Sequence, residues 1–310
     1  MNTSIQEIYK NFSAGMYDFA YRNKTLIEIL FINILIHWSI LIEDLPGTGK
    51  TTLSKALAKL IGYDFKRIQG TSDLTPQDIL GGEFYDFTSK SIVIRKGAIF
   101  TQLLLIDEIN RMNPKTQSAF LQAMEEKKVS IMWQEYELDS GFFVIATQNP
   151  IEHTWTFPLP EAQKDRFTSR ISIWFPDDAL QLEIIKNNSY ISLEEKLEIL
   201  QPCITKEDIR YHRQKISKIK INDTLWKRFV SFFNHLKLSD DLLYPLSQRW
   251  ISSFMLWCRT YAYLQGREYV IPEDWQKILE SFLVHRLDIK GSEVGIIYDL
   301  YTKSFRNFHV

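Results

Sequence analysis

The chain has few cysteines, and none is placed for a structural bridge or a metal site. Its two cysteines, Cys203 and Cys258, lie far apart and form no C-x-x-C motif, and its six histidines lack the spacing of metal ligands. This usage favours neither a disulfide framework nor a zinc-binding fold. It is typical of a reducing compartment, so a cytoplasmic location is expected.

The sequence also lacks an excess of charge of either sign and a long hydrophobic run. Its 37 basic and 38 acidic residues give a formal net charge of -1, which does not indicate a nucleic-acid partner. The most apolar stretch, residues 27–42, is interrupted by Glu28, Asn33 and His37. It falls short of the ~20 residues that a membrane-spanning helix needs. The first residues show no signal segment, so a soluble protein without a membrane span is expected.

What the sequence does contain is an alternation of strands and helices. Apolar runs of strand length, typical of a parallel sheet covered on both faces, occupy residues 39–42, 103–107 and 142–147. Two more strands are predicted at 65–69 and 171–175, and helices at 51–60 and 115–126. Residues 83–95 and 129–138 are predicted as inserted β-hairpins. The expected fold is an α/β core with a parallel sheet flanked by helices.

After Pro176 the predicted strands stop and helices follow. Amphipathic helices are predicted at 223–236, 246–264 and 272–287. We therefore divide the chain into a lead-in and α/β nucleotide-binding domain (1–190), a linker (191–220) and an all-helical domain (221–310). The basic run within 206–220 is interpreted as a solvated face of the linker rather than a nucleic-acid patch.

The clearest motif lies between the first apolar strand and the helix that follows it. Glycines at 47 and 49 allow the backbone to curl, so that successive N–H groups face phosphate oxygens. Lys50 would reach the β- and γ-phosphates of ATP, and the Thr51 hydroxyl would bind Mg²⁺. Asp44 replaces the usual first glycine at the strand end. The predicted nucleotide-binding residues of this loop are Pro46, Gly47, Thr48, Gly49, Lys50, Thr51 and Thr52.

Two further strands end in polar residues. Asp107 and Glu108 follow the strand at 103–107, where Asp107 would hold Mg²⁺, directly or through water, and Glu108 would polarise the attacking water. Asn149 follows the next strand and could bind the γ-phosphate or that water, although an Asn-Pro turn is the structural alternative.

Together these motifs resemble the MoxR family of AAA+ ATPases. This family belongs to the helix-2-insert clade and is related to the magnesium-chelatase-type and CbbQ/NorQ-type ATPases. The resemblance extends over residues 20–287 and is most specific in the block 103–170, with further matches at 266–274. It implies a P-loop AAA+ core and a C-terminal helical lid domain, with both hairpins facing the pore and partner surface of a ring.

The resemblance also implies roles for three more residues. Asn149 takes the sensor 1 position, and Arg249 falls at the sensor 2 position of the lid. Arg166 matches the arginine finger that enters the site of the neighbouring subunit, and Arg170 is a second candidate. A surface salt bridge is the alternative for Arg166, and an exposed helix start for Arg249. A finger that acts on a neighbour implies a homo-oligomeric ring, usually a hexamer.

Two positions depart from the family pattern. MoxR-like chains usually carry Gly-Gln near the adenine pocket, where this chain has Arg22 and Asn23. Selectivity for adenine is therefore left open, although Asn23 could hydrogen-bond a base edge. Trp250 also follows Arg249 where a small residue is common.

The expected function is Mg²⁺-dependent ATP hydrolysis by a ring that remodels, assembles or activates a protein partner. The resemblance suggests a client with a von Willebrand A-type domain. Two alternatives stay open. One is a nucleic-acid-linked motor of a restriction- or defence-like system, and the other is a nucleotide-binding structural switch with negligible turnover.

Overall fold

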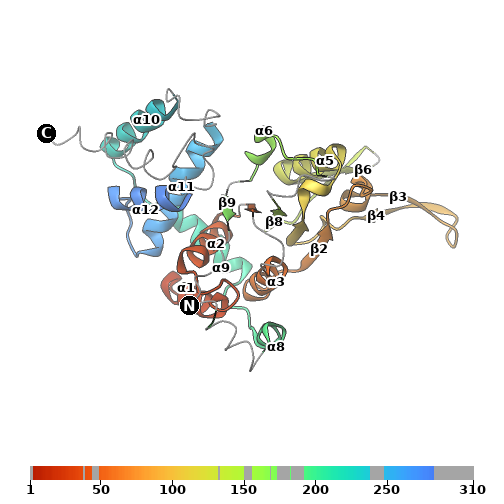
Figure 1. Cartoon of the computed structure of the whole chain (residues 1–310), viewed down its shortest axis with the longest axis horizontal. Helices are drawn as coiled ribbons and strands as arrows, with labels where there is room; N and C mark the ends of the chain where they lie inside the picture. Colours follow the sequence, from red (N-terminus) through yellow and green to blue (C-terminus); the bar gives the residue numbers. More distant parts are fainter. Residues whose placement is uncertain are drawn as a thin grey trace.

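The computed structural model describes residues 3–37, 39–43, 49–131, 133–149, 156–167, 169–172, 192–237 and 248–282, together with Leu182. An α/β layer lies beside a helical body (Figure 1). Within these ranges no helix has the length and apolar character needed to cross a membrane.

Five described strands form one parallel sheet in the order β2-β5-β8-β1-β9. They are β1 (Ile40–Glu43), β2 (Phe65–Gln69), β5 (Leu103–Asp107), β8 (Phe143–Gln148) and β9 (Ser169–Ser172). Every residue of β1, β5 and β8 is buried, which explains their unbroken apolar runs. Strand β9 begins two residues before the predicted strand at 171–175, whose last three residues lie outside the described ranges.

Helices cover both faces of this sheet. Alternate residues of a strand point to opposite faces, and in β5 they enter two separate hydrophobic clusters. Leu103 and Leu105 pack with α3 (Lys50–Leu60) and the lead-in helices, whereas Leu104 and Ile106 pack with α5 (Pro114–Glu126). The predicted three-layer α/β core is therefore confirmed.

The lead-in helices α1 (Ile5–Met16) and α2 (Lys24–Ile36) join the core to the helical body. From Leu26 to Ile36, α2 is buried at every residue except Glu28, as expected for a helix that is apolar all round. Its buried amide, Asn33, donates to the Ile29 carbonyl (2.8 Å) and accepts from the Ser169 hydroxyl (2.8 Å). The bond from Ser169 ties α2 to the edge strand β9.

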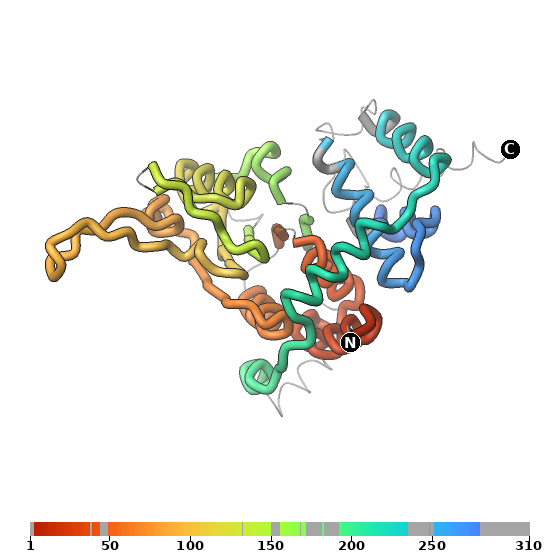
Figure 2. Tube along the Cα trace, turned by 180° about the vertical axis from the view of Figure 1, so that it is seen from behind, coloured from red at the N-terminus to blue at the C-terminus, as the bar shows by residue number. Residues whose placement is uncertain are grey.

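Both predicted insertions are antiparallel hairpins. The first pairs β3 (Gly81–Asp86) with β4 (Ser91–Lys96), after the short helix α4 (Pro76–Leu80). The second pairs β6 (Lys128–Ile131) with β7 (Gln134–Glu137). Figures 1 and 2 show that the β3–β4 hairpin extends far from the rest of the α/β layer.

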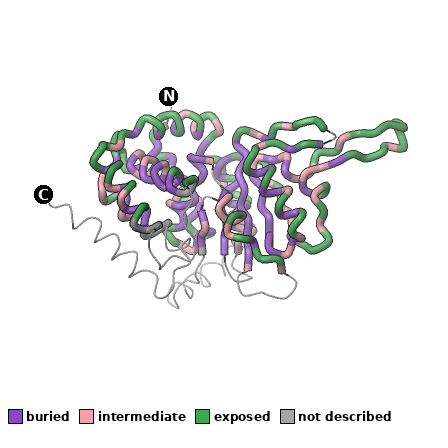
Figure 3. Tube along the Cα trace, turned by 90° about the horizontal axis from the view of Figure 1, so that it is seen from above, coloured by how far each residue is buried: buried purple, intermediate pink, exposed green. Residues whose placement is uncertain are grey.

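Helix α8 (Leu193–Ile199) lies against α3 of the α/β layer (Figure 1). The helical body contains α9 (Lys206–Ile216), α10 (Asp223–Lys237), α11 (Gln248–Leu264) and α12 (Pro272–Phe282). Residues 191–220, predicted as a linker, thus include two helices. One face of α9 buries Ile209, His212 and Ile216 against the main core, while most of its basic residues are exposed. The basic residues of α9 thus form a solvated face, as predicted, and the opposite face of the helix packs against the core. Figure 3 colours the trace by burial and shows buried residues gathered inside the molecule, with exposed residues along its outer helices and hairpins.

Candidate nucleotide-binding site

A cavity of about 310 Å³ opens at the carboxyl edge of the sheet. Because the strands are parallel, the ends of β2, β5 and β8 meet there, beside the start of α3. The lining residues are Gly49, Lys50, Thr51, Thr52, Arg67, Gln69, Asp107, Glu108, Thr147, Gln148 and Asn149. The described half of the predicted phosphate loop therefore comes together with Asp107, Glu108 and Asn149. Pro46, Gly47 and Thr48 lie outside the described residues.

Gly49 sets the entry of the loop into α3. It has a positive φ of 66° and is the N-cap of this 11-residue helix. The positive φ favours glycine, and a Cβ atom at this position would also lie 2.9 Å from the Tyr21 hydroxyl and push it aside. The N-terminus of α3 is thereby placed at the cavity, where its N–H groups favour an anion such as phosphate.

The oxygen atoms of Thr51 and Asp107 fit a magnesium ion. Thr51 Oγ1 lies 3.1 Å from Asp107 Oδ2. Adjacent ligands of an octahedral Mg²⁺, each at ~2.1 Å from the ion, lie about 3.0 Å apart. In the described chain no group of three or more His, Cys, Asp or Glu could hold a metal alone. Mg²⁺ takes few protein ligands and completes its shell with phosphate oxygens and water.

Thr147 fixes the orientation of both acidic residues. Its buried hydroxyl donates to Asp107 Oδ1 (3.2 Å) and accepts from the Glu108 N–H (2.9 Å). The sequence analysis did not assign it a role, although a hydroxyl at the end of a buried strand, two residues before Asn149, was the available signal.

Glu108 holds a backbone conformation that non-glycine residues rarely adopt, with φ of 57° and ψ of 53°. Such a residue costs about 1–3 kcal/mol, and the fold must support it. Gly70 provides part of that support, because its N–H donates to the Asp107 carbonyl (2.7 Å). A Cβ on Gly70 would lie 2.2 Å from the Glu108 carbonyl oxygen, so only glycine fits. Sequence reasoning missed Gly70, since this close approach depends on the pairing of β2 with β5.

Two side chains of β2 also reach the acidic residues. Arg67 Nε lies 2.7 Å from Asp107 Oδ2, and the same guanidinium donates to Gln69 Oε1 (2.9 Å). Gln69 Nε2 in turn donates to Glu108 Oε2 (2.8 Å), which also pairs with Arg111 Nε at 3.2 Å in the short helix η1 (Ile109–Arg111). Arg67 and Gln69 were not predicted as site residues.

The remaining predicted residues lie elsewhere. Arg166 follows α6 (Glu161–Lys164) and pairs with Glu125 Oε2 (3.1 Å), and it does not line the cavity of its own chain. Arg170, the second finger candidate, binds Glu43, which also accepts from Gln148. These contacts place Arg170 inside its own core.

Asn23 does not line this cavity in the described structure. The Asn23 side chain caps α2 by accepting from the Leu26 N–H (3.0 Å). Arg249 lies in the first turn of α11, and its side chain is outside the described part of the chain.

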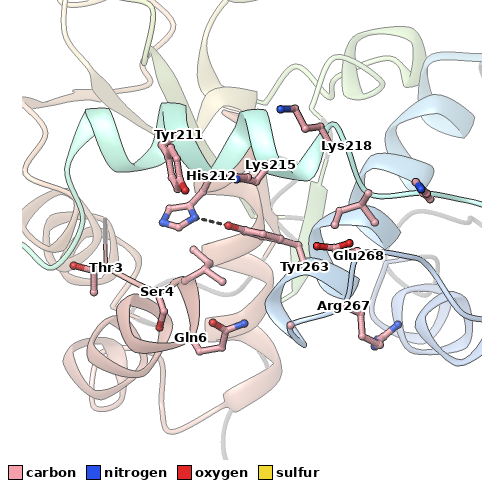
Figure 4. Close-up of a pocket in the computed structure, with 14 residues that line it drawn as sticks. Thr3, Ser4, Gln6, Tyr211, His212, Lys215, Lys218, Tyr263, Arg267 and Glu268 are labelled. Atoms are coloured by element: carbon pink, nitrogen blue, oxygen red, sulfur yellow. Dashed lines mark hydrogen bonds between the residues drawn. The ribbon is translucent and has the colours of Figure 1, made fainter. Parts of the chain in front are cut away.

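A larger cavity of about 560 Å³ lies between the start of α1, α9 and the end of α11 (Figure 4). His212 Nδ1 lies 2.7 Å from the Tyr263 hydroxyl at its wall, and Lys215 and Lys218 stand near the rim. None of its lining residues belongs to the predicted nucleotide motifs. The smaller cavity is therefore the candidate nucleotide site, chosen by the chemistry of its lining residues and not by its size.

Comparison with known proteins agrees with this geometry. The family model described as the ATPase family associated with various cellular activities (AAA) matches residues 39–169. The model of the AAA lid domain matches residues 251–295. The sheet, the cavity at its carboxyl edge and the helical lid thus define an AAA+ ATPase fold.

Similar proteins identify the family within the AAA+ ATPases to which the chain belongs. YeaC from Bacillus subtilis (strain 168) is 39% identical over 257 residues, covering 82% of this chain and 78% of YeaC. Chaperone MoxR1 from Mycobacterium tuberculosis is 33% identical over 275 residues, covering 84% of this chain and 71% of MoxR1. The crystal structure of a candidate ATPase from Cytophaga hutchinsonii superposes with a TM-score of 0.84 at 31% identity, covering 96% and 94% of the two chains. The chain belongs to the MoxR family of AAA+ ATPases.

Proposed function

We propose that this protein hydrolyses ATP with Mg²⁺ and, as a homo-oligomeric ring, uses the reaction to remodel, assemble or activate a protein partner. The observation that carries the proposal is the convergence of Lys50, Thr51, Asp107 and Glu108 on one cavity, with the two metal-ligand oxygens 3.1 Å apart. Membership of the MoxR family supports the same reading.

Each side chain has a separate task in this proposal. Lys50 and the N-terminus of α3 bind the phosphates, and Thr51 and Asp107 hold Mg²⁺, which when bound neutralises the developing phosphate charge. Glu108 orients the attacking water and accepts its proton. Gln69 and Arg111 both contact its Oε2, so they hold the carboxylate in place through one oxygen. Asn149 hydrogen-bonds the γ-phosphate or the water.

The ring follows from the position assigned to Arg166. Within its own chain this arginine pairs with Glu125 and stands outside the nucleotide cavity. We propose that it acts on the site of the neighbouring subunit as an arginine finger, in a ring that is usually hexameric in this family. Arg249 would contact the nucleotide from the lid, and Asn23 would face the base. Selectivity for adenine is left to experiment.

We propose a protein client that carries a von Willebrand A-type domain. The β3–β4 hairpin supports a protein partner, because it presents exposed apolar side chains far from the core (Figure 2). They are Phe84, Tyr85, Phe87, Ile92 and Val93. Solvent-exposed apolar clusters of this kind mark protein interaction sites. At the tip of the second hairpin, Trp133 is also fully exposed.

The first test is ATP turnover measured together with mass in solution, with and without Mg²⁺, over a range of protein concentrations. Turnover that rises as the chain assembles supports the proposal. Nucleotide binding with negligible turnover at every concentration would instead favour a structural switch. Turnover that depends on DNA and falls steeply with salt would favour a nucleic-acid motor.

The assignment of the base is tested by Glu108→Gln. This variant keeps a side chain of the same shape but cannot accept a proton, so it should bind ATP normally and lose about 10²–10⁴-fold in turnover. Glu135→Gln is the matched control, since Glu135 is an exposed carboxylate on β7. Undiminished turnover in Glu108→Gln would contradict the assignment.

A further inference from the structure

Another cavity of the helical body is lined by three cations and, among the residues that the structure describes, by no acidic side chain. Its volume is about 620 Å³. Lys218 and Lys220 come from the connection between α9 and α10, and Arg259 comes from α11. It adjoins the cavity of Figure 4, with which it shares Lys218 and Lys220, and it shares no residue with the nucleotide cavity. We refer to it as the cationic cavity.

The three cations have no counter-ion of their own. Within the described part of the chain, none of them forms an ion pair with a carboxylate, whereas the nearby Arg267 is paired with Asp274. Arg259 is partly buried, and its Nε is closed off from solvent without a hydrogen-bond partner among the described residues. Burying a guanidinium donor without an acceptor costs free energy. An anion in the cavity would offset part of that cost and the repulsion among the three charges.

The fold, and not only the local run of basic residues, brings these charges together. The Lys220 N–H donates to the Glu268 carbonyl (2.9 Å), and the Val270 N–H donates to the Lys220 carbonyl (3.0 Å). These bonds hold the α9–α10 connection beside the segment that follows α11. Arg259 thus reaches the same cavity as Lys218 and Lys220 from a distant part of the sequence.

The start of α10 adds further hydrogen-bond donors. Asn222 lines the cavity and caps α10, because its Oδ1 accepts from the Leu225 N–H (2.7 Å). With Oδ1 occupied, the NH₂ group of this amide remains available as a donor. The N-terminus of the 15-residue helix α10 also carries partial positive charge, which favours an anion nearby.

Cations and N–H donors together select a phosphate group. A phosphate monoester carries nearly two negative charges near neutral pH and accepts hydrogen bonds through three oxygens. Arginine binds such a group through two parallel N–H donors, and lysines add point charges. The volume lies within the range of small-molecule sites, roughly 300–1,000 Å³, so an organic remainder has room. Ile219, Val270 and the exposed ring of Tyr269 provide apolar surface for it.

We propose that the cationic cavity binds a small phosphorylated organic molecule. Arg259, Lys218 and Lys220 hold the phosphate, and the organic part lies against Tyr269. The proposal goes beyond the function proposed above and does not rest on it, because no residue of the nucleotide cavity takes part.

The test is calorimetric titration of the full-length protein with ribose 5-phosphate, up to millimolar concentration and at constant ionic strength. All proteins carry Lys50→Ala, so that the phosphate loop does not compete for the ligand. Arg259→Gln should raise the Kd about tenfold or more, the effect of losing a charge-assisted hydrogen bond. Lys220→Gln, at an exposed lysine, should raise it about threefold.

The matched control is Arg210→Gln, the same substitution at an exposed arginine of α9 that lines neither cavity of the helical body. Its Kd should stay within about twofold of the unmodified site, the scatter expected of a surface substitution. Two results would overturn the site. One is no saturable binding of ribose 5-phosphate, and the other is equal Kd values in Arg259→Gln and Arg210→Gln proteins that unfold at the normal temperature. Should Arg259→Gln fail to fold, Lys220→Gln supplies the same comparison.

Inorganic phosphate and ribose, titrated separately, distinguish the parts of the ligand. Ribose alone should not bind, and inorganic phosphate should bind more weakly than ribose 5-phosphate, because it cannot use the apolar wall. Equal affinities for inorganic phosphate and ribose 5-phosphate would overturn the organic part of the proposal and restrict the cavity to a phosphate ion.

Discussion

The carboxyl edge of the sheet and the aromatic core of the helical body are both buried, but the first consists of hydrogen-bonded polar side chains and the second of packed aromatic rings. At the edge, Glu43, Asp107 and Thr147 are polar, nearly inaccessible and bonded to other side chains. In the helical body, Phe229, Phe254 and Trp275 pack ring against ring. Buried polar groups add little net stability, whereas buried aromatic rings add much. Substitutions at the edge should therefore impair activity, and those in the helical body should impair folding.

The largest expected effect is on activity alone. Arg166→Ala should lower turnover about 10³-fold or more, the contribution of an arginine finger. Its thermal midpoint should hardly move, because the ion pair with Glu125 is partly exposed and such pairs add at most about 1 kcal/mol. Turnover and thermal unfolding are measured on the same preparation.

Mixing two variants of the subunit distinguishes an arginine finger from an arginine with only a structural role. Subunits with Lys50→Ala lack phosphate binding but still carry Arg166, so adding them to Arg166→Ala subunits should restore part of the turnover. No recovery at any mixing ratio, in rings shown to contain both variants, would argue against action on the neighbouring subunit.

The second prediction concerns folding alone. Phe254 is fully buried, with its ring 5.7 Å from that of Phe229 and 6.2 Å from that of Trp275. Phe254→Ala should lower the free energy of unfolding by about 3–5 kcal/mol in a urea titration. Val230→Ala, on the exposed face of α10, is the control and should cost much less. If Phe254→Ala lowered the free energy of unfolding no more than this control, the aromatic core would not be the region that supports folding.

The smallest effect is expected outside both regions, at His37, which lies between α2 and β1 at the amino edge of the sheet and contacts Arg213 of α9. Burial, and then the charges of Arg213, Lys127 and Lys206, lower the pKa of His37 from 6.5 to about 4, with Asp139 opposing them. Arg213 can only donate to Nδ1 (3.3 Å), so the folded ring is neutral with its proton on Nε2, beside Tyr63. Below pH 6.5 the unfolded chain takes up a proton that the folded chain refuses until about pH 4, so stability falls across this window.

The variant His37→Asn removes this titration and keeps a residue that tolerates the positive φ of 54°. Between pH 7 and pH 5.5 the unmodified chain should lose about 1 kcal/mol more than the variant in urea titrations. Parallel losses in the two proteins would mean that His37 does not contribute to the acid sensitivity.

The sequence predicted most of the sheet because its strands are buried on both faces. Such strands need continuous apolar runs, and β1, β5 and β8 have them, with bounds that differ from the predicted ones by at most one residue. The residues around Lys50, Asp107 and Glu108 were also predictable, since each motif stands directly after a strand or before a helix. Parallel strands must then bring them to one edge.

The rest depends on contacts that chain order does not specify. Arg67 and Gln69 resemble ordinary solvated residues until the register sets them beside Asp107 and Glu108. Gly70 is required because the backbone of Glu108 passes so close that a Cβ atom at position 70 would lie 2.2 Å from the Glu108 carbonyl oxygen. The segment 191–220 was interpreted as a linker because its charged residues dominate its composition, although three apolar or aromatic positions of α9 are buried against other helices.

The order of the strands has a consequence for how the chain is made. Strand β1 is the first to leave the ribosome, but its hydrogen-bonding neighbours in the sheet are β8 and β9, about a hundred residues later. Strand β1, which precedes the predicted phosphate loop, therefore waits without its sheet neighbours for roughly five to twenty seconds at ordinary rates of synthesis. An apolar strand without its neighbours is prone to aggregation, so newly made chains are most vulnerable before β8 has emerged.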